Sequence, residues 1–265
     1  MEIKNYHKAE SLDEAYQLLI SNPKNAIIGG GAWMKLSSPS IETLIDLKDL
    51  KLDQIIESKS SIEIGSMVTL QQLETNESIM KLGHGFISQS LSVILGVGFR
   101  NIATIGGTIV GRYAFSDVIP ALLTLPVKLV FYPNKEMSLE DFLNLKGKFN
   151  DILTHIIIEK KTGKGFFKKV ALTPLEFAIL NVAVFKSEND FQIAIGSRPG
   201  GAVLAHEAMA FLNSQKEISD EVIEKTSNIV LDTIKFGSNK SGSEDYRKAL
   251  AKSYVKRGIK EVTFK

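Results

Sequence analysis

Two glycine clusters limit more than any other feature what this chain can fold into. The first is IIGGGAW at residues 27–33 and the second is TIGGT at residues 104–108, and each follows a β-branched stretch. Glycine permits positive φ angles and lets successive N–H groups point into one concavity, which is how backbone nests hold phosphate oxygens. Paired glycines also mark bulges and tight turns. Two clusters of similar construction nevertheless favour a shared ligand.

Neither cluster fits the common nucleotide fingerprints. A Rossmann G-x-G-x-x-G that begins at Gly29 would need glycine at Met34, and the P-loop sequence Gly-Lys-[Ser/Thr] is absent. A phosphorylated ligand would therefore be held differently. Beyond the second cluster, Ser116 and Asp117 offer a hydroxyl and an acceptor-only carboxylate suited to sugar hydroxyls, although Asp before an apolar helix is also a common N-cap.

Composition excludes several function classes. With 265 residues and 44% apolar content the chain can bury a core, and a formal charge of +2 gives no basic excess for binding nucleic acid. The absence of cysteine excludes disulfides, thiolate nucleophiles and iron–sulfur ligation by this chain. The four histidines lack metal-site spacing, so we predict no metal site and no catalytic side chain. Neither a signal peptide nor a membrane span is visible, and cytoplasmic localisation is the default expectation.

Periodicity and capping signals predict an α+β fold. Ser11 and Glu14 form a capping-box pattern that starts a helix. Runs of apolar and β-branched residues that are bounded by turn residues predict strands. The predicted strands are AII before the first glycine cluster, TLIDL, SIEIG, VKLVFY, DILTHIIIEK, KGFFKKVAL and the hairpin FAILNVAVF with FQIAIGS. One helix is predicted to start at Thr69, and others are predicted over SIMKLGHGFISQSLSVILGV and SLEDFLNL. Two more helices are predicted over 217–235 and 243–259.

Several stretches resemble the FAD-binding (medium) subunit of the molybdenum hydroxylases, such as xanthine dehydrogenase and carbon monoxide dehydrogenase. FRNIATIGGTIVGRYAFSDVIPAL is similar to the family pattern Arg-Asn-x-Ala-Thr-Ile-Gly-Gly-Asn followed by Ser-Asp-x-x-Pro-Ala-Leu. IIGGGAWMKL lies where the family has its first flavin loop. IAIGSRPGGAVLAHEAMAFL and GSEDYRKALAKSYVKRGI resemble its C-terminal domain, so the resemblance spans nearly the whole chain.

The resemblance implies a two-lobed FAD-binding fold of the vanillyl-alcohol-oxidase-like type, followed by a C-terminal α/β domain of sheet plus helices. The implied domains are FAD-binding subdomains at 1–52 and 53–160 and a C-terminal domain at 161–265. The diphosphate of FAD would lie between the two glycine clusters, Ser116 and Asp117 would contact the sugar, Lys168 matches a basic position near the cofactor, and Leu153 would touch the adenine side. The complete implied cofactor set is Ile28, Gly29, Gly30, Gly31, Ala32, Trp33, Met34, Thr104, Ile105, Gly106, Gly107, Thr108, Ser116, Asp117, Leu153 and Lys168.

By the same resemblance the chain works in a complex. Partner subunits would carry [2Fe-2S] clusters and molybdopterin, and FAD would pass electrons to NAD or another acceptor. The chain departs from the family at Ala32 and Trp33, where Thr or Ser and then Asp, Asn or Glu are usual, at Thr108 in place of Asn, and at Leu172 and Thr173 in place of arginines. Two alternatives stay open: a stand-alone flavin-dependent oxidoreductase, and a non-enzymatic assembly subunit that no longer holds FAD.

Overall fold

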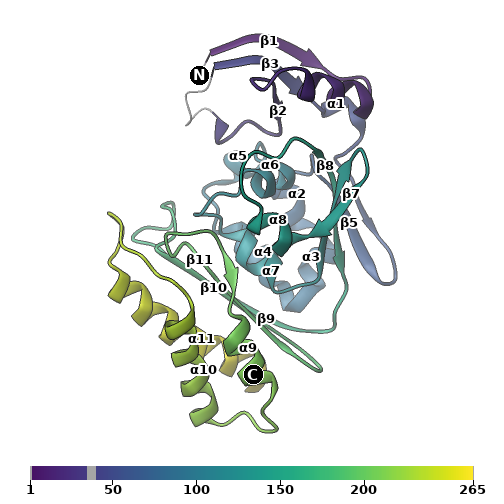
Figure 1. Cartoon of the computed structure of the whole chain (residues 1–265). Helices are drawn as coiled ribbons and strands as arrows, with labels where there is room; N and C mark the ends of the chain where they lie inside the picture. The colour runs from purple at the N-terminus through teal and green to yellow at the C-terminus, as the bar shows by residue number, and fades with distance from the viewer. Residues whose placement is uncertain (1, 35–39, 265) are drawn as a thin grey trace. The chain divides into compact units, whose positions relative to one another are not determined.

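The computed structural model describes residues 2–34 and 40–264, and the chain forms two compact units (Figure 1). Unit 1 comprises Met1–Leu73, Val97–Gly111 and Val127–Glu159; unit 2 comprises Glu74–Gly96, Arg112–Pro126 and Lys160–Lys265. Both units contain sheets and helices, so the fold is α+β as predicted. The chain passes between the units several times, and the domain boundaries predicted at 52 and 160 stay predictions.

Unit 1 contains a small parallel sheet in the order β1-β3-β2. Its strands are β1 (Glu2–Lys8), β2 (Ala26–Ile28) and β3 (Ser40–Asp46), and α1 (Leu12–Ser21) connects the first two. The Ser11 hydroxyl accepts a hydrogen bond from the N–H of Glu14, which confirms the predicted cap of this helix. Ala15 and Leu19 of α1 pack with Ile45 of β3 in one buried cluster.

The second sheet of unit 1 is antiparallel, in the order β4-β5-β8-β6-β7. Its strands are β4 (Ile55–Glu57), β5 (Ser61–Gly65), β6 (Val127–Tyr132), β7 (Lys135–Ser138) and β8 (Ile152–Glu159). The helical segments of this unit are η2 (Lys48–Leu50), α2 (Leu70–Thr75), α5 (Val97–Arg100), α6 (Ile105–Val110) and α8 (Leu139–Asn144). β8 is the central strand of this sheet, and its apolar residues are buried on both faces.

Unit 2 is built on the antiparallel sheet β12-β11-β10-β9. Its strands are β9 (Gly163–Val170), β10 (Leu180–Ser187), β11 (Phe191–Gly196) and β12 (Val203–Leu204), and the predicted hairpin of β10 and β11 is confirmed. Val184 and the other residues on the same face of β10 pack in one core with three helices. These helices are α9 (His206–Asn213), α10 (Asp220–Thr233) and α11 (Glu244–Phe264). Helices α10 and α11 confirm the two predicted over 217–235 and 243–259.

The other face of the unit 2 sheet is covered by segments from earlier in the chain. They are α3 (Glu77–Lys81), η3 (Leu82–Gly85), α4 (Phe86–Ser92) and α7 (Val118–Leu123). Phe86 stacks on Phe185 of β10 with ring centroids 5.8 Å apart. A Cβ at Gly165 would lie 2.2 Å from the Phe86 ring, so only glycine lets β9 pass beneath it.

One local prediction needs correction. The helical pattern over SIMKLGHGFISQSLS does not form one helix, because Gly83 and His84 adopt positive φ angles of 52° and 62° and break it. The second glycine cluster lies at the start of a helix, where Thr104 caps α6 and Gly106 and Gly107 lie in the first turn.

Candidate functional site

The first glycine cluster is the loop that leaves the edge strand β2. Gly31 has φ = 68°, a conformation that glycine adopts without the steric cost of a side chain. Within the described part of the chain, no hydrogen bond is donated by the amides of Gly29, Gly30 or Gly31. Unused N–H groups on successive residues of a loop are what a backbone anion nest requires.

The second cluster differs because its amides already have acceptors. The N–H of Ile105 donates to the Val68 carbonyl and that of Gly106 to the Ser66 carbonyl, both at 2.9 Å. The N–H of Gly107 donates to the Thr104 hydroxyl at 3.1 Å, the usual N-cap bond. Thr108 donates its hydroxyl to the Thr104 carbonyl at 2.9 Å. A ligand at this cluster would have to share these donors.

The structure brings the two clusters into direct contact within unit 1. A Cβ at Gly29 would lie 2.5 Å from the Thr104 hydroxyl oxygen and 3.5 Å from the Cα of Gly107. A Cβ at Gly30 would lie 1.4 Å from the carbonyl oxygen of Ile102, which no relaxation of side chains could relieve. The chain's own backbone is therefore what excludes a methyl group at Gly30.

Gly106 and Gly107 differ in what surrounds them. A Cβ at Gly106 would lie 2.5 Å from the Ser66 carbonyl oxygen, so this glycine also serves chain packing. A Cβ at Gly107 would meet only the Thr104 hydroxyl at 3.1 Å and the Cα of Gly29 at 4.0 Å. Gly107 therefore lies beside the loop that carries the unused amides and is packed less tightly than Gly106.

The other predicted residues of unit 1 have different surroundings. Ile28, Ala32, Trp33 and Met34 are half-buried, and the Trp33 ring lies 4.8 Å from that of Phe99, centroid to centroid. This contact gives the indole a packing partner within unit 1. Leu153 lies in β8 and is buried.

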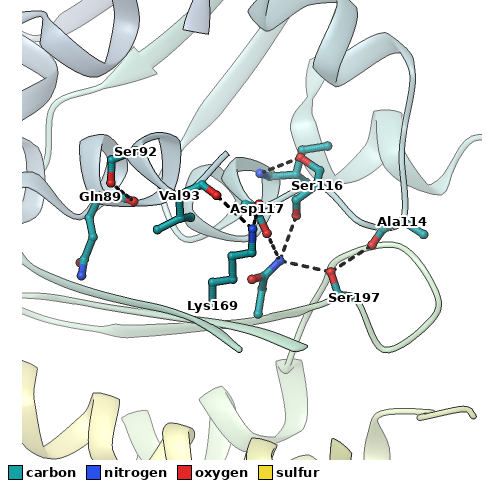
Figure 2. Close-up of polar contacts among 10 residues, drawn as sticks. Gln89, Ser92, Val93, Ala114, Ser116, Asp117, Lys169 and Ser197 are labelled. Carbon is teal, nitrogen blue, oxygen red and sulfur yellow. Dashed lines mark hydrogen bonds and ion pairs between the residues drawn. The ribbon is translucent and has the colours of Figure 1, made fainter. Parts of the chain in front are cut away.

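In unit 2, Ser116 and Asp117 lie at the start of α7 and both are buried (Figure 2). Ser116 caps the helix, since its hydroxyl accepts from the N–H of Ile119 at 3.4 Å, whereas Asp117 makes no capping bond. The Asp117 carboxylate instead accepts from the Asn181 amide at 3.0 Å and lies 3.2 Å from the Lys169 ammonium.

Lys169 and Asn181 were missed by the sequence reasoning. Their signals were present: Asn181 interrupts the otherwise apolar strand FAILNVAVF, and Lys169 is one residue from the predicted Lys168. On β9, alternate residues face opposite sides of the sheet. Lys169 faces α7 and its side chain is only 7% exposed, while Lys168 is exposed with its ammonium 5.8 Å from the Tyr254 ring centroid. The structure therefore brings Lys169, and not Lys168, to Asp117.

The Asp117 pair lies in a low-dielectric setting. Burial raises the pKa of the Asp117 carboxyl above its ordinary value, and the Lys169 charge and the Asn181 amide oppose that rise. The Asn181 amide also donates to the Ser116 carbonyl at 3.3 Å and to the Ser197 hydroxyl at 3.2 Å (Figure 2). Its own oxygen is buried and has no hydrogen-bond partner among the described residues.

Beside this network is a pocket of about 370 Å³ that belongs wholly to unit 2. It is lined by Ser92, Val93, Leu95, Lys169, Ala171, Leu172, Thr173, Pro174 and Leu175. The lining is mostly apolar and Lys169 is its one charged member.

Residues 2–34 and 40–264 contain neither a metal-binding cluster nor a membrane-spanning helix. No group of three or more His, Asp or Glu side chains is arranged to hold a metal ion. No helix is long and apolar enough to cross a membrane.

Comparisons with known proteins identify the family. Residues 1–160 match the FAD binding domain in molybdopterin dehydrogenase, and residues 166–262 match the CO dehydrogenase flavoprotein C-terminal domain. The protein named uncharacterized protein YgfM of Escherichia coli (strain K12) is 27% identical over 211 residues, which are 77% of this chain and 78% of that protein. The glyceraldehyde dehydrogenase medium chain of Sulfolobus acidocaldarius is 24% identical over 278 residues, 97% of this chain and 98% of the relative.

A solved structure shows the same fold. Carbon monoxide dehydrogenase from Hydrogenophaga pseudoflava superposes with a TM-score of 0.87 at 22% identity, over 97% of this chain and 96% of that one. FAD is the cofactor of the family that the first match describes. Because the two family matches together extend from residue 1 to residue 262, this chain belongs to the FAD-binding subunits of the molybdenum hydroxylases.

Proposed function

We propose that this chain is the flavin subunit of a molybdopterin-dependent dehydrogenase or hydroxylase complex. In this role it accepts electrons from [2Fe-2S] clusters of a partner and passes them to NAD or another acceptor. FAD, when bound, supplies chemistry that no side chain here can, because a flavin exchanges electrons both singly and in pairs. The work of the chain's own residues is to bind and orient the cofactor.

The observation that carries the proposal is the contact between the two glycine clusters. The first cluster offers the amides of Gly29, Gly30 and Gly31, which donate no hydrogen bond among the described residues. These donors fit a diphosphate, whose oxygens accept several N–H bonds at once. Gly107 lies next to this loop, since a Cβ there would be 4.0 Å from the Cα of Gly29, so a diphosphate held by these amides would lie close to it.

The remaining predicted contacts belong to the same proposal. Ser116 and Asp117 would bind hydroxyls of the sugar, Lys168 would lie near the cofactor and Leu153 would pack near the adenine. In unit 2 the Asp117 carboxylate is already held by Asn181 and Lys169. An ordered carboxylate of this kind is pre-oriented, so it loses little freedom when it binds a hydroxyl.

The absence of cysteine and the name of one relative support the proposed partner subunits. The chain contains no cysteine, so iron–sulfur clusters that feed a flavin on this chain must be held by another chain. The relative from Sulfolobus acidocaldarius is named a medium chain, which indicates an enzyme of several subunits. We extend that organisation to this protein.

One observation favours a second candidate, an assembly subunit that no longer holds FAD. Ala32 provides no hydroxyl to a phosphate, and a net hydrogen bond of this kind contributes about 1 kcal/mol. The second cluster also has its amides occupied by Val68, Ser66 and Thr104. Both features would weaken binding of the diphosphate without blocking its place.

A flavin titration of the purified chain separates the two candidates. We expect the visible absorption of oxidised flavin to stay with the protein after gel filtration. The variant Gly107→Ala adds a methyl group beside Gly29 and should weaken FAD binding by about tenfold, or about 1.4 kcal/mol. The matched control Gly201→Ala adds the same group where nothing lies within 4 Å. A colourless chain that takes up no added FAD would establish the assembly subunit instead.

A further inference from the structure

The first glycine loop, residues 29–33, ends in an aromatic contact within unit 1. Trp33, two residues after Gly31, is the only tryptophan of the chain. Its ring lies 4.8 Å from that of Phe99, centroid to centroid, at an interplanar angle of 56°, and both side chains are half-buried. Tilted ring pairs at this spacing attract each other beyond the area that they bury. The contact therefore holds the far end of the loop against α5.

The near end of the loop is held by its own backbone. A Cβ at Gly30 would lie 1.4 Å from the Ile102 carbonyl oxygen, and a Cβ at Gly29 would lie 2.5 Å from the Thr104 hydroxyl oxygen. The N–H of Ile102 donates to the Phe99 carbonyl at 3.0 Å. The residues that contact the two ends of the loop therefore belong to one short, hydrogen-bonded segment that begins at α5.

The unused amides lie between these two attachments. Gly29, Gly30 and Gly31 donate no hydrogen bond among the described residues, and Gly31 has φ = 68°. Glycine loses more backbone freedom on ordering than any other residue. A ligand that had to order three glycines itself would bind more weakly, whereas a loop ordered in advance avoids that cost. An attachment beyond Gly31 is therefore worth affinity to a ligand of these amides.

We infer that the Trp33–Phe99 ring pair positions the first glycine loop for a diphosphate. Trp33 acts through the glycine amides, which the ring contact holds in one conformation, and neither ring has to touch the ligand. The inference rests on the proposed function for its ligand, because this loop is the proposed place of the FAD diphosphate. It adds that affinity depends on an aromatic ring at residue 33, where a polar side chain is not required.

Binding of ADP to the full chain tests the inference by calorimetry, because ADP carries the diphosphate without the flavin. Trp33→Ala and Phe99→Ala should each weaken ADP binding by about tenfold, since the ligand must then order the loop. The double variant should also be weakened by about tenfold, because either change alone breaks the same contact. Trp33→Phe keeps a ring and should bind ADP within about threefold of the wild type.

Phe149→Ala is the matched control. Phe149 is half-buried in unit 1, and its ring lies 4.7 Å from that of Phe131. The variant removes a ring pair of the same spacing that contacts neither glycine cluster, so ADP binding should be unchanged. Losses that add up to about a hundredfold in the double variant, or wild-type affinity in Trp33→Ala, would overturn the inference. If Trp33→Ala does not fold, Phe99→Ala and Trp33→Phe decide the outcome.

Tryptophan fluorescence gives a second readout, since Trp33 is the single indole of the chain. In Phe99→Ala the emission should lie at longer wavelength than in the wild type before any ligand is added, because the indole loses its packing partner. In Phe149→Ala the emission should be that of the wild type. Identical emission in Phe99→Ala and the wild type would show that the ring pair does not hold the loop.

The flavin content of each preparation keeps this test separate from the proposed function. If the wild type retains FAD and Trp33→Ala binds ADP equally well, the proposed function stands and the inference is removed. If the wild type binds ADP through the ring pair but takes up no FAD, the inference stands and the flavin role is removed. A wild type that binds neither would overturn both.

Discussion

Arg247 shows how one residue can connect several segments of unit 2. It is fully buried on α11, and its guanidinium donates to the carbonyls of Ile179 and Ser197 and to the side chain of Asn239. No carboxylate pairs with it among the described residues, and burial lowers the pKa of its guanidinium. Carbonyl oxygens from separate loops replace a counterion, so Arg247 has a structural role.

At the residue scale we therefore expect Arg247→Met to destabilise the chain by about 3 kcal/mol or more, because several buried acceptors lose their donor together. Urea unfolding of the variant measures the change. Arg257→Met is the control on the same helix, since Arg257 is exposed and, among the residues that the structure describes, its one ion pair is with Glu261 at 3.7 Å. Its effect should stay within about 0.5 kcal/mol. If the two variants lost similar amounts of unfolding free energy, Arg247 would contribute no more to stability than an exposed arginine.

At the element scale, helices α10 and α11 are joined by ion pairs on their exposed faces. Glu224 of α10 accepts hydrogen bonds from Lys252 and Lys256 of α11, and Asp220 pairs with Lys260. The bonds from Lys252 and then Lys256 lower the pKa of Glu224 to about 2. Because the folded-state pKa lies below the ordinary value of 4.5, this stabilisation is complete above pH 4.5 and is lost as the pH falls towards about 2.

The variant Glu224→Gln should therefore unfold with a weaker dependence on pH between about 4.5 and 2 than the wild type. Melting temperatures across this range measure the difference, which should shrink in high salt because the pairs are exposed. Glu221→Gln is the control on the same helix, where Glu221 forms no ion pair among the described residues. If the melting temperature of Glu224→Gln fell with pH as steeply as that of the wild type, the ion pairs of Glu224 would not account for the loss of stability in acid.

At the scale of the whole molecule, the interleaving of the two units has consequences for folding. The sheet of unit 2 is covered on one face by α9, α10 and α11 and on the other by residues 74–96 and 112–126. Phe185 of β10 is 1% exposed because α4 packs on it. A fragment of residues 161–265 would expose this second face to water.

We expect this fragment to lack a cooperative thermal transition and to bind a hydrophobic dye. The control is the full chain cut by a protease site placed at residues 160–162, which retains the covering segments and should melt cooperatively. Calorimetry of both preparations provides the comparison. A fragment that melts as sharply as the cut full chain would show that residues 161–265 fold independently.

Local signals in the sequence were sufficient for most secondary elements. Ser11 caps α1 and Ser138 caps α8, because an N-cap depends on residues three positions apart. Alternation of apolar residues located β6, β8 and the hairpin of β10 and β11. The break at Gly83 and His84 was missed because the apolar spacing continues across it.

What the sequence by itself determined is the position of the longer strands, the capped helices and the two glycine clusters, since these depend on neighbouring residues, whereas β1, β4, β7 and β12 were not predicted. The tertiary structure alone decided which glycines meet the chain's own backbone and which leave space. It also decided that Asp117 pairs with Lys169 and Asn181, three residues from separate segments. Such contacts arise only when the sheet of unit 2 closes against α7, because the energy of a buried charge depends on everything packed around it.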